Sequence, residues 1–88
     1  LLADARRDQG HYDEAEATYR ELIDTEHDGL RRASFVQHLG KTLYAAGRLT
    51  EAAACFSESL AARRALGADA DQLTSSEFAL RAASRRAT

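Results

Sequence analysis

Proline, methionine and tryptophan are absent from this sequence of 88 residues, and cysteine occurs once, as Cys55. Without proline and with only five glycines, little interrupts a helical backbone. No apolar run approaches the roughly 18 residues needed to cross a bilayer, and no charged-then-apolar leader stands at the start. A single cysteine cannot form an internal disulfide or a multi-cysteine zinc site, which fits a reducing compartment. These absences favour an all-α protein that is soluble and cytoplasmic and has no membrane partner.

Composition and charge predict one small globular domain. The chain is 44% hydrophobic and 30% charged, and its net charge of −2 draws it toward neither nucleic acid nor anionic membrane. The charge is uneven, because residues 1–28 hold nine acids and three arginines, a net −6, whereas residues 29–88 have a net charge of +4. Abundant arginine and alanine with a single lysine give a bacterial-like composition, typical of coding sequences rich in G and C. The missing initiator methionine indicates a fragment or a processed product.

Five segments show helical periodicity, separated by glycine or polar breaks. Gly10, Gly47 and Gly67 each follow such a segment directly, where a residue with positive φ ends a helix at least cost. Turns this short force neighbouring helices to run antiparallel. The first and last segments have thinner apolar stripes than the others and are expected at the ends of a stack. The expected helices cover residues 1–9, 12–27, 30–46, 49–66 and about 71–87.

The chain also repeats itself with an offset of 37 residues. Residues 10–15, GHYDEA, correspond to residues 47–52, GRLTEA, and an aromatic residue follows each at the same distance, Tyr19 and Phe56. The pattern Val36-x2-Leu39-Gly40-x2-Leu43, followed by Ala52-x3-Phe56, resembles the tetratricopeptide repeat, whose unit spans about 34 residues. The longer spacing and the Arg-Ala-Leu-Gly ending at 64–67 resemble the kinesin-light-chain-like variants of that repeat.

The resemblance implies a short right-handed superhelix of antiparallel helix pairs, about two and a half repeats in a single domain over residues 1–88. Residues 1–28 form a truncated first repeat and residues 29–67 a second. Residues 68–88 form either a capping helix or the first helix of a third repeat. In this packing the small residue Gly40 lets the paired helix cross closely where Ala52 faces it, and Phe56 fills the space between repeats.

No catalytic constellation, cofactor motif or metal site is evident in the sequence. Neither a glycine-rich phosphate loop nor Gly-x-Ser-x-Gly occurs, and His11, His27 and His38 lie on different segments without metal-ligand spacing. Cys55 directly precedes Phe56 in an apolar segment and is interpreted as a buried, inert packing residue. We therefore expect a protein that is not an enzyme and that needs no cofactor.

The resemblance implies a protein or peptide partner held on a concave face formed by the first helix of each pair. In the repeat with secure register this face is formed by Ser34, Gln37, His38, Lys41 and Tyr44, opposite Leu39 and Leu43. Asp4 stands where chaperone-binding members of the family carry an asparagine, so recognition of an acidic C-terminal peptide is not expected. The arginines at 81, 85 and 86 are interpreted as a solvated helix end, not as a nucleic-acid site.

Two functional classes stay open at this point. The first is a peptide-binding adaptor, part of a larger protein. The second is a structural or self-association segment of a multidomain regulator, which forms a homo-oligomer through uncapped ends. Apolar residues at both ends of the stack motivate the second class, Leu1 and Leu2 at one end and Leu73, Phe78 and Leu80 at the other.

Overall fold

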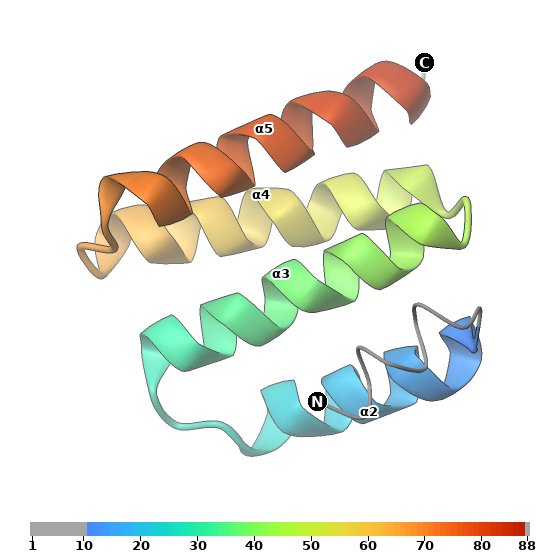
Figure 1. The fold of residues 1–88 in the computed structure, drawn as a ribbon. Coiled ribbons are helices and arrows are strands. Elements are labelled where there is room, and N and C mark those ends of the chain that lie inside the picture. The colour runs from blue at the N-terminus through green and yellow to red at the C-terminus, as the bar shows by residue number, and fades with distance from the viewer. Residues whose placement is uncertain (1–10, 88) are drawn as a thin grey trace.

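The computed structural model describes residues 11–87, and this part of the chain forms four α-helices and no strand. Successive helices run antiparallel, and each packs against the next along the chain (Figure 1). The all-α fold of antiparallel helix pairs predicted from the sequence is confirmed. The helices are α2 (Tyr12–Thr25), α3 (Gly29–Ala45), α4 (Leu49–Ala65) and α5 (Ala70–Ala87).

The four described helices lie within two residues of the bounds expected from periodicity. Their termini follow the local chemistry of the breaks. Gly47 and Gly67 have φ values of 81° and 73°, and they end the last turns of α3 and α4 as predicted. Gly10 and the expected helix over residues 1–9 lie outside the described residues. Carboxylates cap the N-termini of α3 and α5. Asp28 Oδ1 accepts a hydrogen bond from Arg31 N, and Asp69 Oδ1 accepts one from Gln72 N, both at 2.9 Å.

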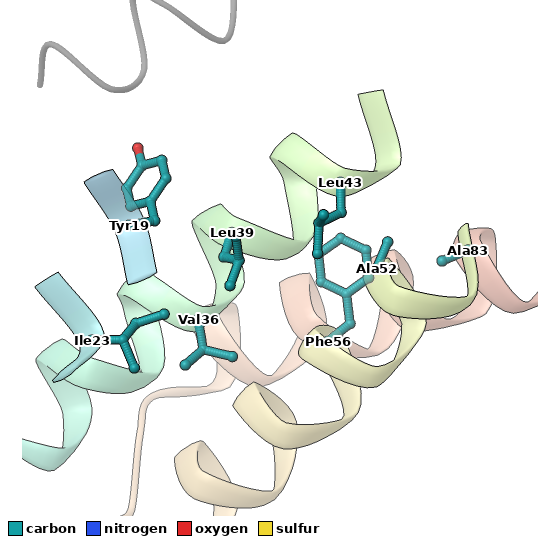
Figure 2. Packing of buried hydrophobic residues seen from close by; sticks show 8 residues of the cluster. All are labelled: Tyr19, Ile23, Val36, Leu39, Leu43, Ala52, Phe56 and Ala83. Atoms are coloured by element: carbon teal, nitrogen blue, oxygen red, sulfur yellow. The ribbon is translucent and has the colours of Figure 1, made fainter. Parts of the chain in front are cut away.

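One apolar core runs through all four helices (Figure 2). All of its residues come from the apolar stripes that the sequence predicts for the helices. Tyr19 and Phe56, the two aromatic residues of the repeated pattern, are 0% and 2% exposed. The core consists of Tyr19, Ile23, Val36, Leu39, Leu43, Ala52, Phe56 and Ala83.

Gly40 lies at the close crossing of α3 and α4. A Cβ atom built on Gly40 would lie 2.6 Å from Phe56 Cε1, 2.8 Å from Phe56 Cδ1 and 3.2 Å from Cys55 Cβ. Ala52 is fully buried but is not among these nearest neighbours. The glycine therefore makes room for the ring of Phe56, while the predicted pairing of Gly40 with Ala52 stays a prediction.

A buried polar network joins α3, α4 and α5. Arg63 Nη1 donates to Ser76 Oγ at 2.8 Å and to the Gln72 carbonyl oxygen at 3.2 Å, and Ser76 Oγ donates to Gln37 Oε1 at 2.9 Å. Arg63, Ser76 and Gln37 are at most 6% exposed. Burial lowers the pKa of the Arg63 guanidinium, because a charge is held away from water. The network fixes α5 against α3 along a line of directional bonds.

A second polar connection joins α2 to the start of α4. The Arg48 guanidinium donates to both carboxylate oxygens of Glu16 and, at 2.7 and 2.9 Å, to those of Glu51. Arg20 Nε also donates to Glu16 at 2.9 Å. The hydrogen bonds from Arg48 lower the pKa of Glu16 and of Glu51.

Candidate functional site

An apolar cleft lies between α3 and α5. Its main hollow, about 220 Å³, has almost entirely apolar walls, and a second hollow of about 280 Å³ continues it toward the end of α5. Tyr44, Phe78 and Ala82 line both hollows, so the two form one continuous surface, which we call the α3–α5 cleft. The main hollow is lined by Lys41, Tyr44, Phe56, Phe78, Ala79 and Ala82, and the second adds Arg85 and Arg86.

Phe78 is the most exposed large apolar residue of the described chain, with 73% of its surface accessible. Its position on α5 explains this exposure. The fully buried Ala83 lies five residues further on, which places it roughly 140° round the helix from Phe78 at 3.6 residues per turn. The face of α5 that packs into the core therefore carries Ser76 and Ala83, and Phe78 points away from it over the cleft.

Three cations line the cleft together with Phe78. Lys41 on α3 is exposed, and Arg85 and Arg86 stand at the other side of the cleft on the last turns of α5. The Arg86 guanidinium carbon lies 5.0 Å from the centroid of the Tyr44 ring, a cation–π contact that links the ends of the two helices. Among the residues that the structure describes, no acidic side chain lines either hollow of the cleft. The cleft therefore combines apolar walls with a positive rim.

The five residues predicted to form the concave face lie in different environments in the structure. Lys41 and Tyr44 line the α3–α5 cleft. Gln37 was expected to be exposed, but it is 2% exposed and bonded to Ser76, because α5 covers this part of α3. Ser34 is half-buried and accepts from Arg63 Nη2 at 3.4 Å, and His38 stacks on Tyr19 of α2 with ring centroids 5.6 Å apart. The open part of the predicted face is thus its C-terminal half.

Sequence reasoning placed Phe78 on the apolar stripe of the last helix and did not assign it to a binding face. Phe78 lies two positions after the buried Ser76 and outside any 3.6-residue stripe through Ser76 and Ala83, and the burial of Ser76 became visible only in the structure. The basic edge of α5 is also divided. Arg85 and Arg86 line the cleft, whereas Arg81 lines the hollow between α4 and α5.

Two other hollows have a mixed electrostatic character. The hollow between α2, α3 and α4, about 320 Å³, has Ile23, Val36 and Leu39 on its walls and both signs of charge on its rim, including a 3.4 Å ion pair between Arg32 and Glu58. The hollow between α4 and α5 is crossed by an ion pair of 3.7 Å between Arg64 and Glu77. Charged groups of both signs therefore line each of these two hollows.

The metal-ligating side chains and the one cysteine were predicted to have no chemical role. Among residues 11–87, no group of three or more His, Cys, Asp or Glu side chains is placed to hold a metal ion. Cys55 is half-buried at the wall of the hollow between α2, α3 and α4, and burial raises the pKa of its thiol. A raised thiol pKa disfavours the nucleophilic thiolate. No helix in the described part of the chain is long and apolar enough to span a membrane.

The fold and the cleft define a helical-repeat protein. A family model described as tetratricopeptide repeat matches residues 1–26, up to the residue after the end of α2. No curated protein and no solved structure matches the chain. The match covers residues 1–26 of the 88, so it shows that this part of the chain is similar to that family, and the stack of antiparallel helices is consistent with a helical-repeat fold. Repeats of this family are typically non-catalytic scaffolds for protein–protein interaction.

Proposed function

We propose that this protein is a non-catalytic interaction module that holds a segment of a partner protein in the α3–α5 cleft. The exposure of Phe78 above an apolar hollow carries this proposal. A phenylalanine on a helix surface costs solubility, and aromatic residues in desolvated clefts dominate the energetics of many protein interfaces. The hollow of about 220 Å³ has room for one large side chain of a ligand, which sets the scale of the contact.

The cleft is built on rigid elements. Phe56, which belongs to the core, forms part of its wall, and Ala79 and Ala82 on α5 leave the space that larger residues would fill. The network from Arg63 through Ser76 to Gln37 fixes α5 relative to α3. Because both sides of the cleft are held in place before a ligand arrives, binding requires little ordering of the protein.

The division into repeats predicted from the sequence is part of this proposal. In it, α2 completes the first repeat, α3 and α4 form the second, and α5 is a capping helix or begins a third. The longer, kinesin-light-chain-like spacing and a cytoplasmic location also stay predictions. The alternative function, a self-association segment, draws support from the exposed Phe78 and the uneven charge. A dimer seen by light scattering at low salt and loosened at high salt would favour it.

Selection of peptides from a random library displayed on phage tests the proposed function. The affinities of the selected peptides are then measured for the unmodified chain and for the Phe78→Ala and Leu66→Ala variants. Leu66 is a matched control, since it is also a large apolar residue, 50% exposed, but it lies at the end of α4 away from the cleft residues. We expect Phe78→Ala to weaken binding at least about tenfold, the effect of a hot-spot side chain, and Leu66→Ala to leave it unchanged. Equal effects of the two changes would contradict the proposal.

A further inference from the structure

We infer that two copies of this chain associate through α5, with the two α5 helices antiparallel about a two-fold axis at Phe78. This inference goes beyond the proposed function, because it gives the self-association alternative one defined surface. Phe78 also lines the α3–α5 cleft, so the association covers the cleft and competes with the partner segment of the proposed function.

An exposed face of α5 with Phe78 at its centre carries the inference. Phe78 is 73% exposed, and α5 is the last helix of the described stack (Figure 1). At 3.6 residues per turn, the positions four and seven residues before and after Phe78 lie within about 40° of it round the helix. Three of the four side chains there are exposed and one is partly buried. Together with Phe78 they form a surface that we call the Phe78 face, which consists of Asp71, Thr74, Phe78, Ala82 and Arg85.

The Phe78 face is complementary to itself when the second copy runs in the opposite direction. In an antiparallel pair that crosses at Phe78, a residue four or seven positions after the crossing lies opposite the residue as many positions before it in the second copy. The two phenylalanine rings then meet at the axis. Ala82 lies opposite Thr74 of the second copy, and these small side chains leave room for the rings. Arg85 lies opposite Asp71 of the second copy, and the symmetry forms each contact twice.

The charges at the two ends of the face favour the antiparallel direction. In a parallel pair, Asp71 would face Asp71 and Arg85 would face Arg85, and like charges repel. Arg85 already interacts within its own chain. Because a guanidinium has five N–H donors, a carboxylate of the second copy adds to that interaction and does not need to replace it.

The size of the face predicts a weak dimer. A helix of 18 residues is about 27 Å long and about 10 Å wide, so one face of it supplies less than the roughly 800 Å² per partner of a stable interface. Burial of the two phenylalanine rings favours association, and the two exposed ion pairs add little. We therefore expect a reversible dimer with a Kd of about 100 μM at low salt.

Sedimentation equilibrium at protein concentrations from about 10 μM to about 1 mM tests the inference. We expect the dimer to weaken at least about tenfold in Phe78→Ala and to stay unchanged in Leu66→Ala. Leu66 is again the matched control, because it is 50% exposed and lies at the end of α4. Salt should weaken the dimer without abolishing it, since the Debye length falls from about 10 Å at 0.1 M to about 3 Å at 1 M.

Charge-reversed variants test the antiparallel direction. Asp71→Arg places an arginine opposite Arg85, and Arg85→Asp places an aspartate opposite Asp71, so each variant alone should dimerise about tenfold more weakly. In a mixture of the two variants every arginine again faces an aspartate, and a heterodimer as tight as the unmodified dimer should form. Glu21→Arg changes the net charge as much as Asp71→Arg does, but Glu21 is exposed on α2, so this control should leave the dimer unchanged. Far-ultraviolet circular dichroism checks that all variants fold.

The possible outcomes separate the inference from the proposed function. A monomer at the highest concentration, or a dimer that Phe78→Ala leaves intact, would overturn the inference and leave the proposed function standing. A mixture of the charge-reversed variants that associates no better than either alone would overturn the antiparallel pairing. A peptide selected from the random library should dissociate the dimer, and a complex of peptide with intact dimer would contradict the competition for the cleft. If Phe78→Ala abolishes the dimer but leaves the affinity of the selected peptides unchanged, the proposed function is wrong and the inference stands.

Discussion

Adding one methyl group at Gly40 tests the close crossing of α3 and α4. The new Cβ atom would lie 2.6 Å from Phe56 Cε1 and 2.8 Å from Cδ1, well inside van der Waals contact. The Phe56 ring is 2% exposed and packed in the core, so it cannot swing aside without displacing its neighbours. Overpacking costs about 1–3 kcal/mol, and contacts as short as these belong to the upper part of that range, about 2–3 kcal/mol, while replacing glycine by alanine inside a helix returns about 1 kcal/mol. We expect Gly40→Ala to destabilise the fold by about 1–2 kcal/mol.

Gly29 supplies a matched control on the same helix. A Cβ atom there would also meet an atom at 2.6 Å, but the neighbour is the Cδ1 atom of Leu66, a flexible side chain that is 50% exposed. The Leu66 side chain can rotate into solvent at small cost. We therefore expect Gly29→Ala to change the free energy of unfolding by no more than about 0.5 kcal/mol in either direction.

Urea denaturation followed by far-ultraviolet circular dichroism measures both changes. A loss of about 1–2 kcal/mol lowers the melting temperature of a domain this small by about 4–16 °C. Adding Phe56→Leu to Gly40→Ala should recover part of the loss, with a coupling energy of at least about 0.5 kcal/mol, because the smaller side chain vacates the space. Equal effects of Gly40→Ala and Gly29→Ala, or purely additive effects of Gly40→Ala and Phe56→Leu, would refute this explanation.

Two further predictions concern the polar connections. Arg63→Met should destabilise the fold less than Arg63→Ala, by at least about 1 kcal/mol, because methionine fills most of the buried volume and removes the buried charge. Urea denaturation measures the free energy of unfolding of both variants, and equal losses would contradict this prediction. The hydrogen bonds from Arg48 lower the pKa of Glu16, so their stabilisation is fully present above about pH 5 and is lost as the pH falls through the lowered pKa of the folded state. Urea denaturation at a series of pH values should therefore show a steeper acid loss for the unmodified chain than for Arg48→Met, and parallel profiles would show that the pair does not contribute.

Local sequence information was sufficient for the helices and for most of the core. The apolar periodicity placed each described helix within two residues of its observed bounds, and the positive φ values of Gly47 and Gly67 followed from their position after a periodic segment. The repeated aromatic positions, Tyr19 and Phe56, are both in the core. These features depend on one helix at a time or on a pattern that recurs along the chain, so sequence alone determines them.

The candidate site was predicted only in part, because it depends on how α5 lies against α3. Lys41 and Tyr44 were expected on the binding face and line the cleft. The burial of Gln37 could not be read from α3 itself, since its partner Ser76 comes from α5, 39 residues further on. Phe78 was assigned to the apolar stripe, although Ser76 and Ala83 define the buried side of that helix. Because the polar Ser76 is buried in a hydrogen-bond network, the buried face of α5 differs from the face that its hydrophobic residues alone would indicate.

Chemical-shift mapping with a peptide selected from the random library tests the central claim most directly, that a partner segment binds in the α3–α5 cleft. In a titration of the isotopically labelled chain, the backbone amides of Lys41, Tyr44, Phe78 and Ala82 should show the largest changes, and these changes should saturate with one affinity. The amides around Ile23 and Cys55, in the hollow between α2, α3 and α4, should barely move. Saturable changes centred on that hollow, with the four cleft residues unaffected, would contradict the claim.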